Sequence, residues 1–309
     1  MKLSEFRNLD QNTYTLVSFV LATKNRAEYL RKTLEAQREL FGPGAELIIV
    51  DGLSADSTPD VVKKYSDVVT LFISEPDKGT ADAWNKGILL SRGKYIKPLT
   101  DDDVIHKGGM EQAIAVLERH PEVDMLVCGG TRHWGERVVP VWLPPGNNYG
   151  RSVKDVFKYG ASGIGFVIRR TVFSKIGLFD VENLANDREF ALRAISHGVN
   201  VKFCRINLYH HPIYEHSATV AQAKRHERDN YALVKKYTSI GYYFRYRFSR
   251  FLRKHPVLNR LMMAPQNAAI LLKKEGVSGT LQGIMRALLR KKVATDSKTA
   301  DCVWDGGFS

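Results

Sequence analysis

The chain has 309 residues, of which 44% are hydrophobic and 26% charged, enough to build one large domain or two ordinary ones with sizeable cores. Its three cysteines lie far apart and form no CxxC pair, which argues against a disulfide framework or a zinc site and favours a reducing compartment. The N-terminus lacks a signal-peptide core, and no window approaches the roughly 18–20 apolar residues that cross a bilayer, so we expect a cytoplasmic protein.

The net charge of +13 is concentrated near the C-terminus. Residues 241–293 contain twelve Lys or Arg residues and one acid, Glu275, so the rest of the chain contributes only +2. Such an asymmetry predicts that this segment has a distinct partner.

Strand and helix patterns alternate through the first hundred residues. Predicted strands cover 14–23, 45–52, 68–74 and 94–100, and helical patterns cover 26–40, 57–66 and 79–93. Repeated strand–helix–strand units imply right-handed crossovers and a mostly parallel, Rossmann-like α/β sheet. Functional sites in such sheets lie at the carboxyl ends of the strands, which is where Asp51 and Asp101–Asp103 occur.

The pattern after residue 104 is mixed. We predict helices at 107–119, 186–198 and 218–238, strands at 123–130, 137–144 and 199–211, and a strand followed by a short helix within 162–180. We therefore expect residues 1–240 to form one domain with two halves. Residues 14–104 would bind a nucleotide, and residues 105–240 would form the mixed second half.

Three consecutive aspartates, Asp101, Asp102 and Asp103, follow the strand at 94–100. Three like charges repel one another, so something positive should lie among them. A divalent cation such as Mg²⁺ or Mn²⁺ takes oxygen ligands and commonly keeps phosphate oxygens in its shell. Acidic runs also form solvated turns and helix N-caps, so the trio alone leaves both interpretations open.

Four blocks in order carry a family resemblance: "TLVSFVLATKNRAEYLRKTLEA", "ELIIVDGLSADST", "SEPDKGTADAWNKGILLSRGKYIKPLTDDD" and "RRTVFSKIGLFDVENLANDREFALR". Together they resemble the family 2 glycosyltransferases, the large inverting GT-A family, over about residues 14–200. The resemblance implies a GT-A fold, a nucleotide-diphosphate sugar donor, a glycan or lipid-linked acceptor, and Mn²⁺ or Mg²⁺ as cofactor.

The resemblance implies nucleotide-sugar contacts in the front half, at Thr23, Asn25, Asp51, Asp77, Lys78, Asp82 and Asn85. Asp51 matches the aspartate that accepts a base N–H, which suits uracil and guanine alike, and Lys78 could meet the diphosphate. Asp77 as a turn residue and Asp82 as a first-turn helix acid are the structural alternatives. The sequence "VDGLS" departs from the family's more frequent "DDGS", which makes one nucleotide contact less certain.

The resemblance also assigns the acidic run to the metal. Asp103 is the preferred direct ligand, Asp101 is a second candidate, and Asp101 and Asp102 would contact the ribose or donor sugar. His211, in "YHHPIYEHS", is a further candidate for the metal or diphosphate, although His210 and His216 compete with it and a structural histidine is more common.

The block "LANDREFALRA" resembles the helix that carries the catalytic base of the family, which implies Asp187 as base and Glu189 as a weaker candidate. An N-cap role for Asp187 is the structural alternative. Arg188 is a further acceptor or secondary candidate. Trp84 and Trp142 could stack on a sugar or base, with core packing as the alternative for Trp84, which lies within a predicted helix.

The basic segment 241–293 predicts amphipathic helices. Phe244, Phe248 and Phe251 fall on one helical face among arginines, which suits a helix lying in the interface of an anionic membrane. Packing against the domain or a second copy of the chain is the alternative. We expect no nucleic-acid partner, because no recognised module accompanies the charge. Residues 294–309 are predicted to be disordered.

Together with these features, the resemblance implies an inverting, metal-assisted glycosyltransferase of surface polysaccharide synthesis, using preferably a UDP-sugar and located peripherally at the inner face of the membrane. A nucleotidyltransferase-like enzyme is one alternative, but the Gly-rich loop it needs is absent from "ATKNRAEYL". A membrane- or RNA-associated scaffold is the other, and it leaves the carboxylates at the strand ends without a purpose.

Overall fold

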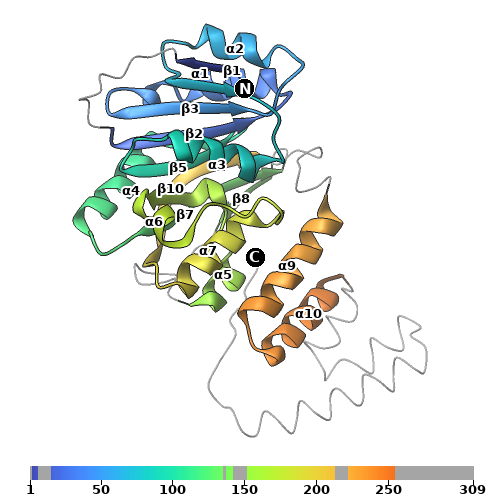
Figure 1. Ribbon diagram of the computed structural model, residues 1–309. Coiled ribbons are helices and arrows are strands. Elements are labelled where there is room, and N and C mark those ends of the chain that lie inside the picture. Colours follow the sequence, from blue (N-terminus) through green and yellow to red (C-terminus); the bar gives the residue numbers. More distant parts are fainter. Residues whose placement is uncertain (1, 6–14, 135–136, 142–151, 213–221, 255–309) are drawn as a thin grey trace, which may run out of the picture. The chain divides into compact units, whose positions relative to one another are not determined.

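The computed structural model describes residues 2–5, 15–134, 137–141, 152–212 and 222–254 (Figure 1). The chain divides into two compact units, Met1–Ser239 and Ile240–Ser309. Every described strand belongs to the first unit. Trp142, the loop 144–151 and the segment 255–309 lie outside the described residues, so the predictions made for them stay predictions.

The front half of the first unit consists of β2 (Val17–Thr23), α1 (Ala27–Ala36), the 3₁₀ turn η1 (Arg38–Phe41), β3 (Ala45–Asp51), α2 (Thr58–Lys64), β4 (Leu71–Ser74), α3 (Thr80–Leu90) and β5 (Tyr95–Thr100). The strands lie parallel in the order β4-β3-β2-β5, as the alternating pattern predicts. The third strand begins at Leu71 rather than residue 68. Val68 and Val69 instead close a buried turn by donating to the carbonyl of Tyr65.

The second half consists of β6 (Val104–Ile105), α4 (Lys107–Arg119), β7 (Met125–Trp134), β8 (Arg137–Val141), α5 (Val153–Tyr159), the 3₁₀ turn η2 (Gly163–Gly165), β9 (Phe166–Arg169), α6 (Thr171–Ile176), α7 (Asn186–Ser196), β10 (Val201–Pro212) and α9 (Ala223–Tyr237). The pattern predicts α4 at its observed bounds but does not predict α5. Strand β9 runs antiparallel to both β5 and β7, whereas β10 is parallel to β7.

The complete sheet is mixed. Its order is β1-β4-β3-β2-β5-β9-β7-β10-β6, with β8 paired to β7. The N-terminal strand β1 (Lys2–Glu5), which the sequence does not predict, runs antiparallel to β4. The expectation of a mostly parallel central sheet with a mixed second half is confirmed, because β6, β8 and β9 add the antiparallel neighbours of the second half.

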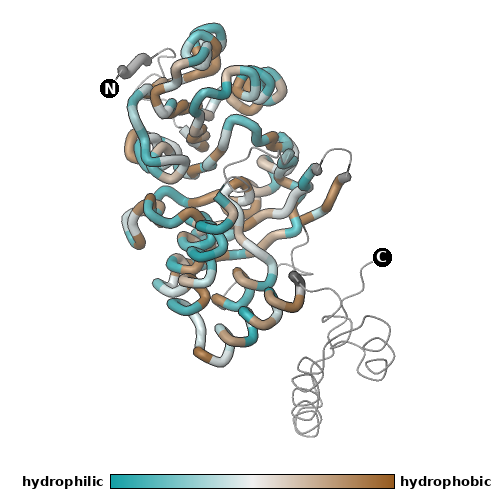
Figure 2. Tube along the Cα trace, turned by 90° about the vertical axis from the view of Figure 1, so that its right-hand side faces the viewer, coloured by the Kyte–Doolittle hydropathy of each residue, from teal (hydrophilic) through white to brown (hydrophobic). Residues whose placement is uncertain are grey.

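Helices cover both faces of the sheet. Leu30 of α1 and Leu117 of α4 pack into one apolar cluster, and Trp84 of α3 and Phe190 of α7 pack into the other. Because strands such as β3 are buried on both faces, they read as continuous apolar runs. Brown and teal residues alternate along the helices in Figure 2, as expected where one face of each helix is buried.

The second unit is described only for α10 (Ile240–Lys254), and the rest of it lies outside the described residues. Within the described part of the chain, every helix is too short or too polar to pass through a lipid bilayer.

Candidate functional site

The acidic run lies at the carboxyl end of β5, and its first two members share a cation. Arg26 Nε lies 2.7 Å from Asp101 Oδ1, and Arg26 Nη2 lies 2.6 Å from Asp102 Oδ2. Thr23 Oγ1 donates a 2.8 Å hydrogen bond to the other oxygen of Asp101. Arg26 therefore supplies part of the positive charge that the run needs, a role that the sequence pattern did not reveal.

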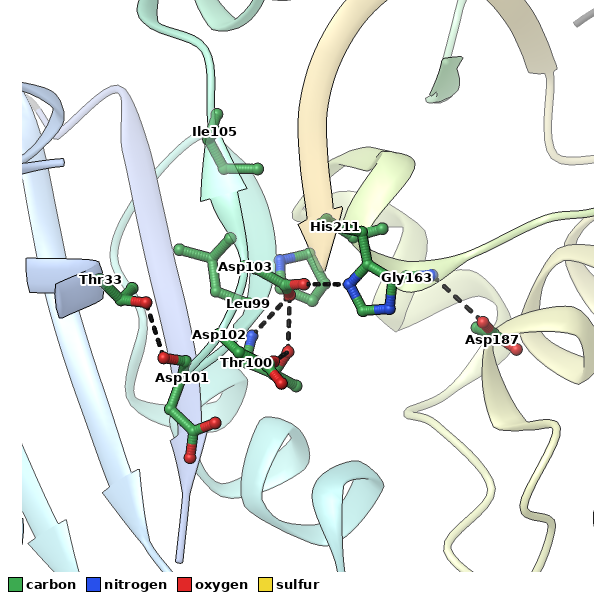
Figure 3. Close-up of polar contacts among 12 residues, drawn as sticks. Thr33, Leu99, Thr100, Asp101, Asp102, Asp103, Ile105, Gly163, Asp187 and His211 are labelled. Atoms are coloured by element: carbon green, nitrogen blue, oxygen red, sulfur yellow. Dashed lines mark hydrogen bonds and ion pairs between the residues drawn. The ribbon is translucent and has the colours of Figure 1, made fainter. Parts of the chain in front are cut away.

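Asp103 has a different set of partners and faces a histidine. Its Oδ2 accepts hydrogen bonds from the backbone N–H and the hydroxyl of Thr100, at 2.8 and 2.7 Å. Its Oδ1 lies 3.0 Å from Nδ1 of His211, and the two side chains face each other in Figure 3. The candidate metal residues Asp103 and His211 thus come together, 108 positions apart in the sequence.

The pairing of β6 with β10 explains this meeting. The antiparallel register places Ile105 opposite Tyr209 and Val104 opposite His210. Continuing that register by one residue sets position 103 opposite position 211. The two-residue strand β6 therefore determines which histidine reaches the acidic run.

Burial and charge shape the protonation of these groups. Burial raises the pKa of Asp101 to about 7, although the charge of Arg26 opposes the rise. Burial and then the charge of Asp103 raise the pKa of Asp102. Burial lowers the pKa of His211, but the hydrogen bond and charge of Asp103 outweigh it, and the net shift is upward. Asp103 therefore favours a positive neighbour at the place where His211 lies.

The side chains that could ligate a metal here suit a divalent cation that is also bound by the substrate. Among the described residues, no group of three or more His, Cys, Asp or Glu side chains is placed to hold a metal. Asp103 and His211 offer one oxygen and one nitrogen, and Arg26 already balances the other two carboxylates. Mg²⁺ and similar ions are commonly bound through one or two carboxylates plus substrate phosphates, which suits this half-site.

Asp187 lies in the first turn of α7 and is partly exposed. Its Oδ2 accepts a 3.3 Å hydrogen bond from the backbone N–H of Gly163, and its Oδ1 accepts one of 2.6 Å from the N–H of Arg188. The N-cap of α7 is Ala185, so the N-cap alternative for Asp187 does not describe this structure. The two bonds hold the carboxylate still, which a base requires.

The other two candidates on α7 have structural partners. Glu189 is buried and pairs with Arg193 at 2.9 Å. Arg188 donates through Nη1 to the side chain of Asn230 on α9. Because Glu189 is buried and paired with Arg193, Asp187 is the better placed of the two acids to meet a substrate hydroxyl.

Lys97 and Trp84 anchor the η2 turn that orients Asp187. The fully buried Lys97 on β5 donates to the carbonyl oxygen of Ile164 at 2.7 Å. Burial lowers the pKa of Lys97 to about 8, against the opposing charge of Asp103. A Cβ on Gly163 would lie 2.6 Å from the ring of Trp84, so only glycine allows this approach. Trp84 is thus a core residue.

Tyr209 lies within electrostatic reach of both Asp103 and Asp187. Burial raises the pKa of Tyr209 to about 12, and the charges of Asp103 and Asp187 both contribute to the rise. The charge of Arg132 opposes it, and Arg132 is the register partner of His211 on β7. Arg132 is a second cation that the sequence did not single out, because "GGTRHW" has no readable motif.

The loops after β2 and β3 are tied together by polar contacts. Asp51 is fully buried, and its carboxylate accepts hydrogen bonds from the N–H and hydroxyl of Ser54 and from the hydroxyl of Ser74, the last at 2.7 Å. Asn25 has a φ of 53° and accepts a 2.8 Å hydrogen bond from the N–H of Ala55. Both side chains shape the strand-end loops, and their contacts with a nucleotide stay predictions.

The remaining front-half candidates lie after β4 and on α3. Asp77 is partly buried and accepts from the N–H of Gly79 at 3.0 Å. Lys78 is exposed, and its backbone N–H donates to Asp82 at 3.0 Å. Asn85 uses both ends of its amide on the backbone of Phe179. Asn85 therefore links the backbone at Phe179 to α3. A contact between Asn85 and a nucleotide sugar would require these two hydrogen bonds to open.

Comparisons with known proteins agree with this architecture. A sequence model of the family described as "Glycosyl transferase family 2" matches residues 18–177, which is 160 of the 309 residues. An uncharacterized glycosyltransferase of Rickettsia typhi is 27% identical over 191 residues, covering 60% of this chain and 59% of the relative. The chain thus spans only about six tenths of that relative's length.

Two solved structures share the fold. Staphylococcus aureus TarS 1–349 in complex with UDP-GlcNAc superposes with a TM-score of 0.60 at 18% identity, covering 71% of this chain and 66% of that chain. The mannosyltransferase PcManGT from Pyrobaculum calidifontis, in complex with GDP-Man and Mn²⁺, gives a TM-score of 0.58 at 17% identity, covering 96% and 84%. The expected GT-A fold is confirmed by this likeness.

Proposed function

The chain belongs to glycosyl transferase family 2, and from that premise we propose that it moves a sugar from a nucleotide-diphosphate donor to an acceptor hydroxyl with inversion at the anomeric carbon. The observation that carries this proposal is that Asp103, paired with His211, and the oriented carboxylate of Asp187 both lie within electrostatic reach of Tyr209. A UDP-sugar is the favoured donor, and a lipid-linked or free glycan of a surface polysaccharide is the proposed acceptor.

The reaction is a single displacement. The acceptor oxygen forms a bond to the anomeric carbon while the bond from that carbon to the nucleotide diphosphate breaks. Asp187 takes the proton of the acceptor hydroxyl, and the Gly163 and Arg188 N–H groups keep its carboxylate aimed. Arg132 on β7 lies opposite His211 on the neighbouring strand β10. From there its cationic side chain can stabilise the negative charge of the leaving diphosphate.

Asp103 and His211 would hold the divalent cation. When bound, such an ion offsets the charge that develops on the leaving diphosphate. The TarS and PcManGT structures contain UDP-GlcNAc and GDP-Man respectively, and the latter also contains Mn²⁺. We propose the same class of donor and ion for this chain.

A thermal-shift screen of UDP, GDP and CDP, each with and without Mn²⁺, tests the donor class. A ligand present at 100 times its Kd adds about 2.7 kcal/mol to the free energy of unfolding, so we expect Tm to rise by about 5 °C with at least one diphosphate plus Mn²⁺. The absence of any rise with every diphosphate contradicts the proposal. Product analysis separates the enzyme alternatives, because a glycosyltransferase releases a nucleoside diphosphate and a nucleotidyltransferase releases pyrophosphate.

We further propose that α10 docks on an anionic membrane. The side chains of Ile240, Phe244, Phe248 and Phe251 are exposed by 66%, 59%, 38% and 46%. These large apolar groups share α10 with Arg245, Arg247 and Arg250. Exposed aromatic residues among cations suit the boundary between lipid headgroups and acyl chains. A membrane-bound enzyme would meet a lipid-linked acceptor directly.

Co-sedimentation of the full-length chain with anionic vesicles tests this surface. We expect replacement of Phe244, Phe248 and Phe251 by serine to lower the bound fraction at least about tenfold, because each buried ring contributes about 1.5–3 kcal/mol. Leu89→Ser with Leu90→Ser is the matched control, since both leucines are exposed on α3. Equal pelleting of the aromatic variant and the wild type contradicts the proposal and favours a contact between protein surfaces.

A further inference from the structure

Tyr209 on β10 is a buried tyrosine whose hydroxyl group lacks a protein partner. Only 1% of the residue is exposed, and no described residue forms a hydrogen bond with the hydroxyl group. Buried tyrosines usually have such a partner. Tyr95 on β5 is equally buried, and its hydroxyl donates to Glu118 at 2.9 Å and accepts from Arg169 at 3.1 Å. The hydroxyl of Tyr209 therefore differs from that of an ordinary core tyrosine.

Two glycines fix the position of the Tyr209 ring. Gly130 of β7 is the register partner of Tyr209, and a Cβ on Gly130 would lie 2.6 Å from both Cγ and Cδ2 of the ring. A Cβ on Gly165 of η2 would lie 3.4 Å from Cε1, which is bonded to the carbon that carries the hydroxyl. The ring therefore fills the space that Gly130 leaves, and its hydroxyl end lies beside η2.

This position lies beside both proposed reactive acids. Asp187 accepts from the N–H of Gly163 in η2, the same turn that lies beside the ring. Asp103 pairs at 3.0 Å with His211, which follows Tyr209 by two residues on β10. The charges of Asp103 and Asp187 both act on the phenol. Tyr209 is therefore near the proposed metal ligand and near the proposed base.

The hydroxyl group of Tyr209 can be reached from outside the core. Among the described residues, the fully enclosed side-chain atoms that lack a hydrogen bond do not include its oxygen. Since this oxygen forms no hydrogen bond, the small exposed area of the residue includes it. An O–H group in such a desolvated place gains more from a partner than one in water, and a substrate oxygen would supply that partner.

The phenol can donate a hydrogen bond, but it cannot serve as the base. A tyrosine has an ordinary pKa of about 10, and burial raises the pKa of Tyr209 further, so the group keeps its proton at neutral pH. During a single displacement, negative charge develops on the oxygen that joins the sugar to the diphosphate. The base lies on the acceptor side of the anomeric carbon and the metal lies on the diphosphate side. A donor near both acids therefore suits the oxygen of the bond that breaks.

We propose that Tyr209 is a further catalytic residue, whose hydroxyl donates a hydrogen bond to the oxygen between the donor sugar and the diphosphate. This inference rests on the proposed function, since it takes the substrate to be a nucleotide-diphosphate sugar. The bond from the anomeric carbon to this oxygen breaks, the electron pair goes to the oxygen, and the phenol keeps its proton. Because the oxygen is uncharged in the intact donor, the hydrogen bond strengthens as the charge develops.

Tyr209→Phe in the full-length chain tests the assignment. The donor is the UDP- or GDP-sugar from which the wild type releases nucleoside diphosphate fastest. We expect kcat to fall by about 10–100-fold, the range for a hydrogen bond to a charged group. Tm should stay within about 2 °C of the wild type, because no hydrogen bond among the described residues is lost.

Calorimetry with Mn²⁺ separates a transition-state contact from general damage to the site. The free nucleoside diphosphate carries a charge on the oxygen that the sugar has left, whereas the intact donor does not. We therefore expect Tyr209→Phe to weaken binding of the free diphosphate by about 10-fold or more, and binding of the intact donor by less than about threefold. The intact donor is measured with Asp187→Asn in both chains, so that transfer does not consume it. A merely structural role would weaken the two ligands alike.

Tyr95→Phe is the matched control. It removes the same group from an equally buried tyrosine, but this hydroxyl bonds to Glu118 and Arg169. We expect the opposite pair of results: Tm falls by about 3 °C or more because those partners are left unpaired, and kcat stays at the wild-type value.

Three results would contradict the assignment, and they differ in what they overturn. A wild-type kcat in Tyr209→Phe overturns this inference alone. Equal weakening of the free diphosphate and the intact donor also overturns it, because the hydroxyl would then act on binding in general or on the shape of the site. If the wild type neither binds a nucleoside diphosphate nor releases one from any UDP- or GDP-sugar, the proposed function falls together with this inference.

Discussion

Asp187→Asn is expected to lower kcat by about 10²–10⁴-fold, the usual contribution of a general base. The variant loses the basic oxygen that takes the acceptor proton, but it keeps the size and most of the contacts of the side chain. The Asn carbonyl can still accept from the N–H of Arg188. We therefore expect the Kd of the donor, measured by calorimetry, to change by less than about threefold.

Asp180→Asn is the matched control for this substitution. Asp180 is exposed seven positions earlier and accepts a hydrogen bond from the N–H of Glu182, so its loss of charge leaves the site untouched. A full transfer rate in Asp187→Asn shows that another group is the base. A similar fall in donor affinity and in kcat would instead indicate that Asp187 acts through binding.

Much of the fold is readable from the sequence because it depends on local patterns. Strands β2 and β3 are buried on both faces, so their apolar runs are continuous and their C-terminal ends lie within one residue of the prediction. Helix α4 lies at its predicted bounds. The mixed half was harder, because an antiparallel insertion such as β9 depends on a pairing with β5 and β7 that no local signal encodes.

In the candidate site, too, some features have a local sequence signal and others depend on the pairing of distant strands. A run of aspartates at the end of a predicted strand implies a positive neighbour, and the structure supplies Arg26 and His211 in addition to any metal. Arg26 lies 76 positions from Asp102, and His211 lies 108 from Asp103. These partners are set by the order of the strands and by the register of β6 against β10, which are properties of the whole fold.

The second large expected effect concerns the proposed metal ligand in the acidic run. Asp103→Asn should lower kcat by about 10²-fold or more, because removing one electrostatic contact to the developing charge typically costs about 10²–10³-fold. It should also remove the response of UDP affinity to Mn²⁺. The reason is geometric: Asp103 is the member of the run that faces His211, whereas Asp101 and Asp102 are bound by Arg26.

Asp101→Asn and Asp102→Asn complete the series and make it decisive. Each of these variants removes one partner of Arg26 while leaving the Asp103–His211 pair in place. If Asp103 is the metal ligand, both variants keep a Mn²⁺-dependent UDP affinity, and His211→Ala weakens that dependence as Asp103→Asn does. If instead Asp102→Asn alone abolishes it, Asp102 rather than Asp103 is the metal ligand and must leave Arg26 when the ion binds.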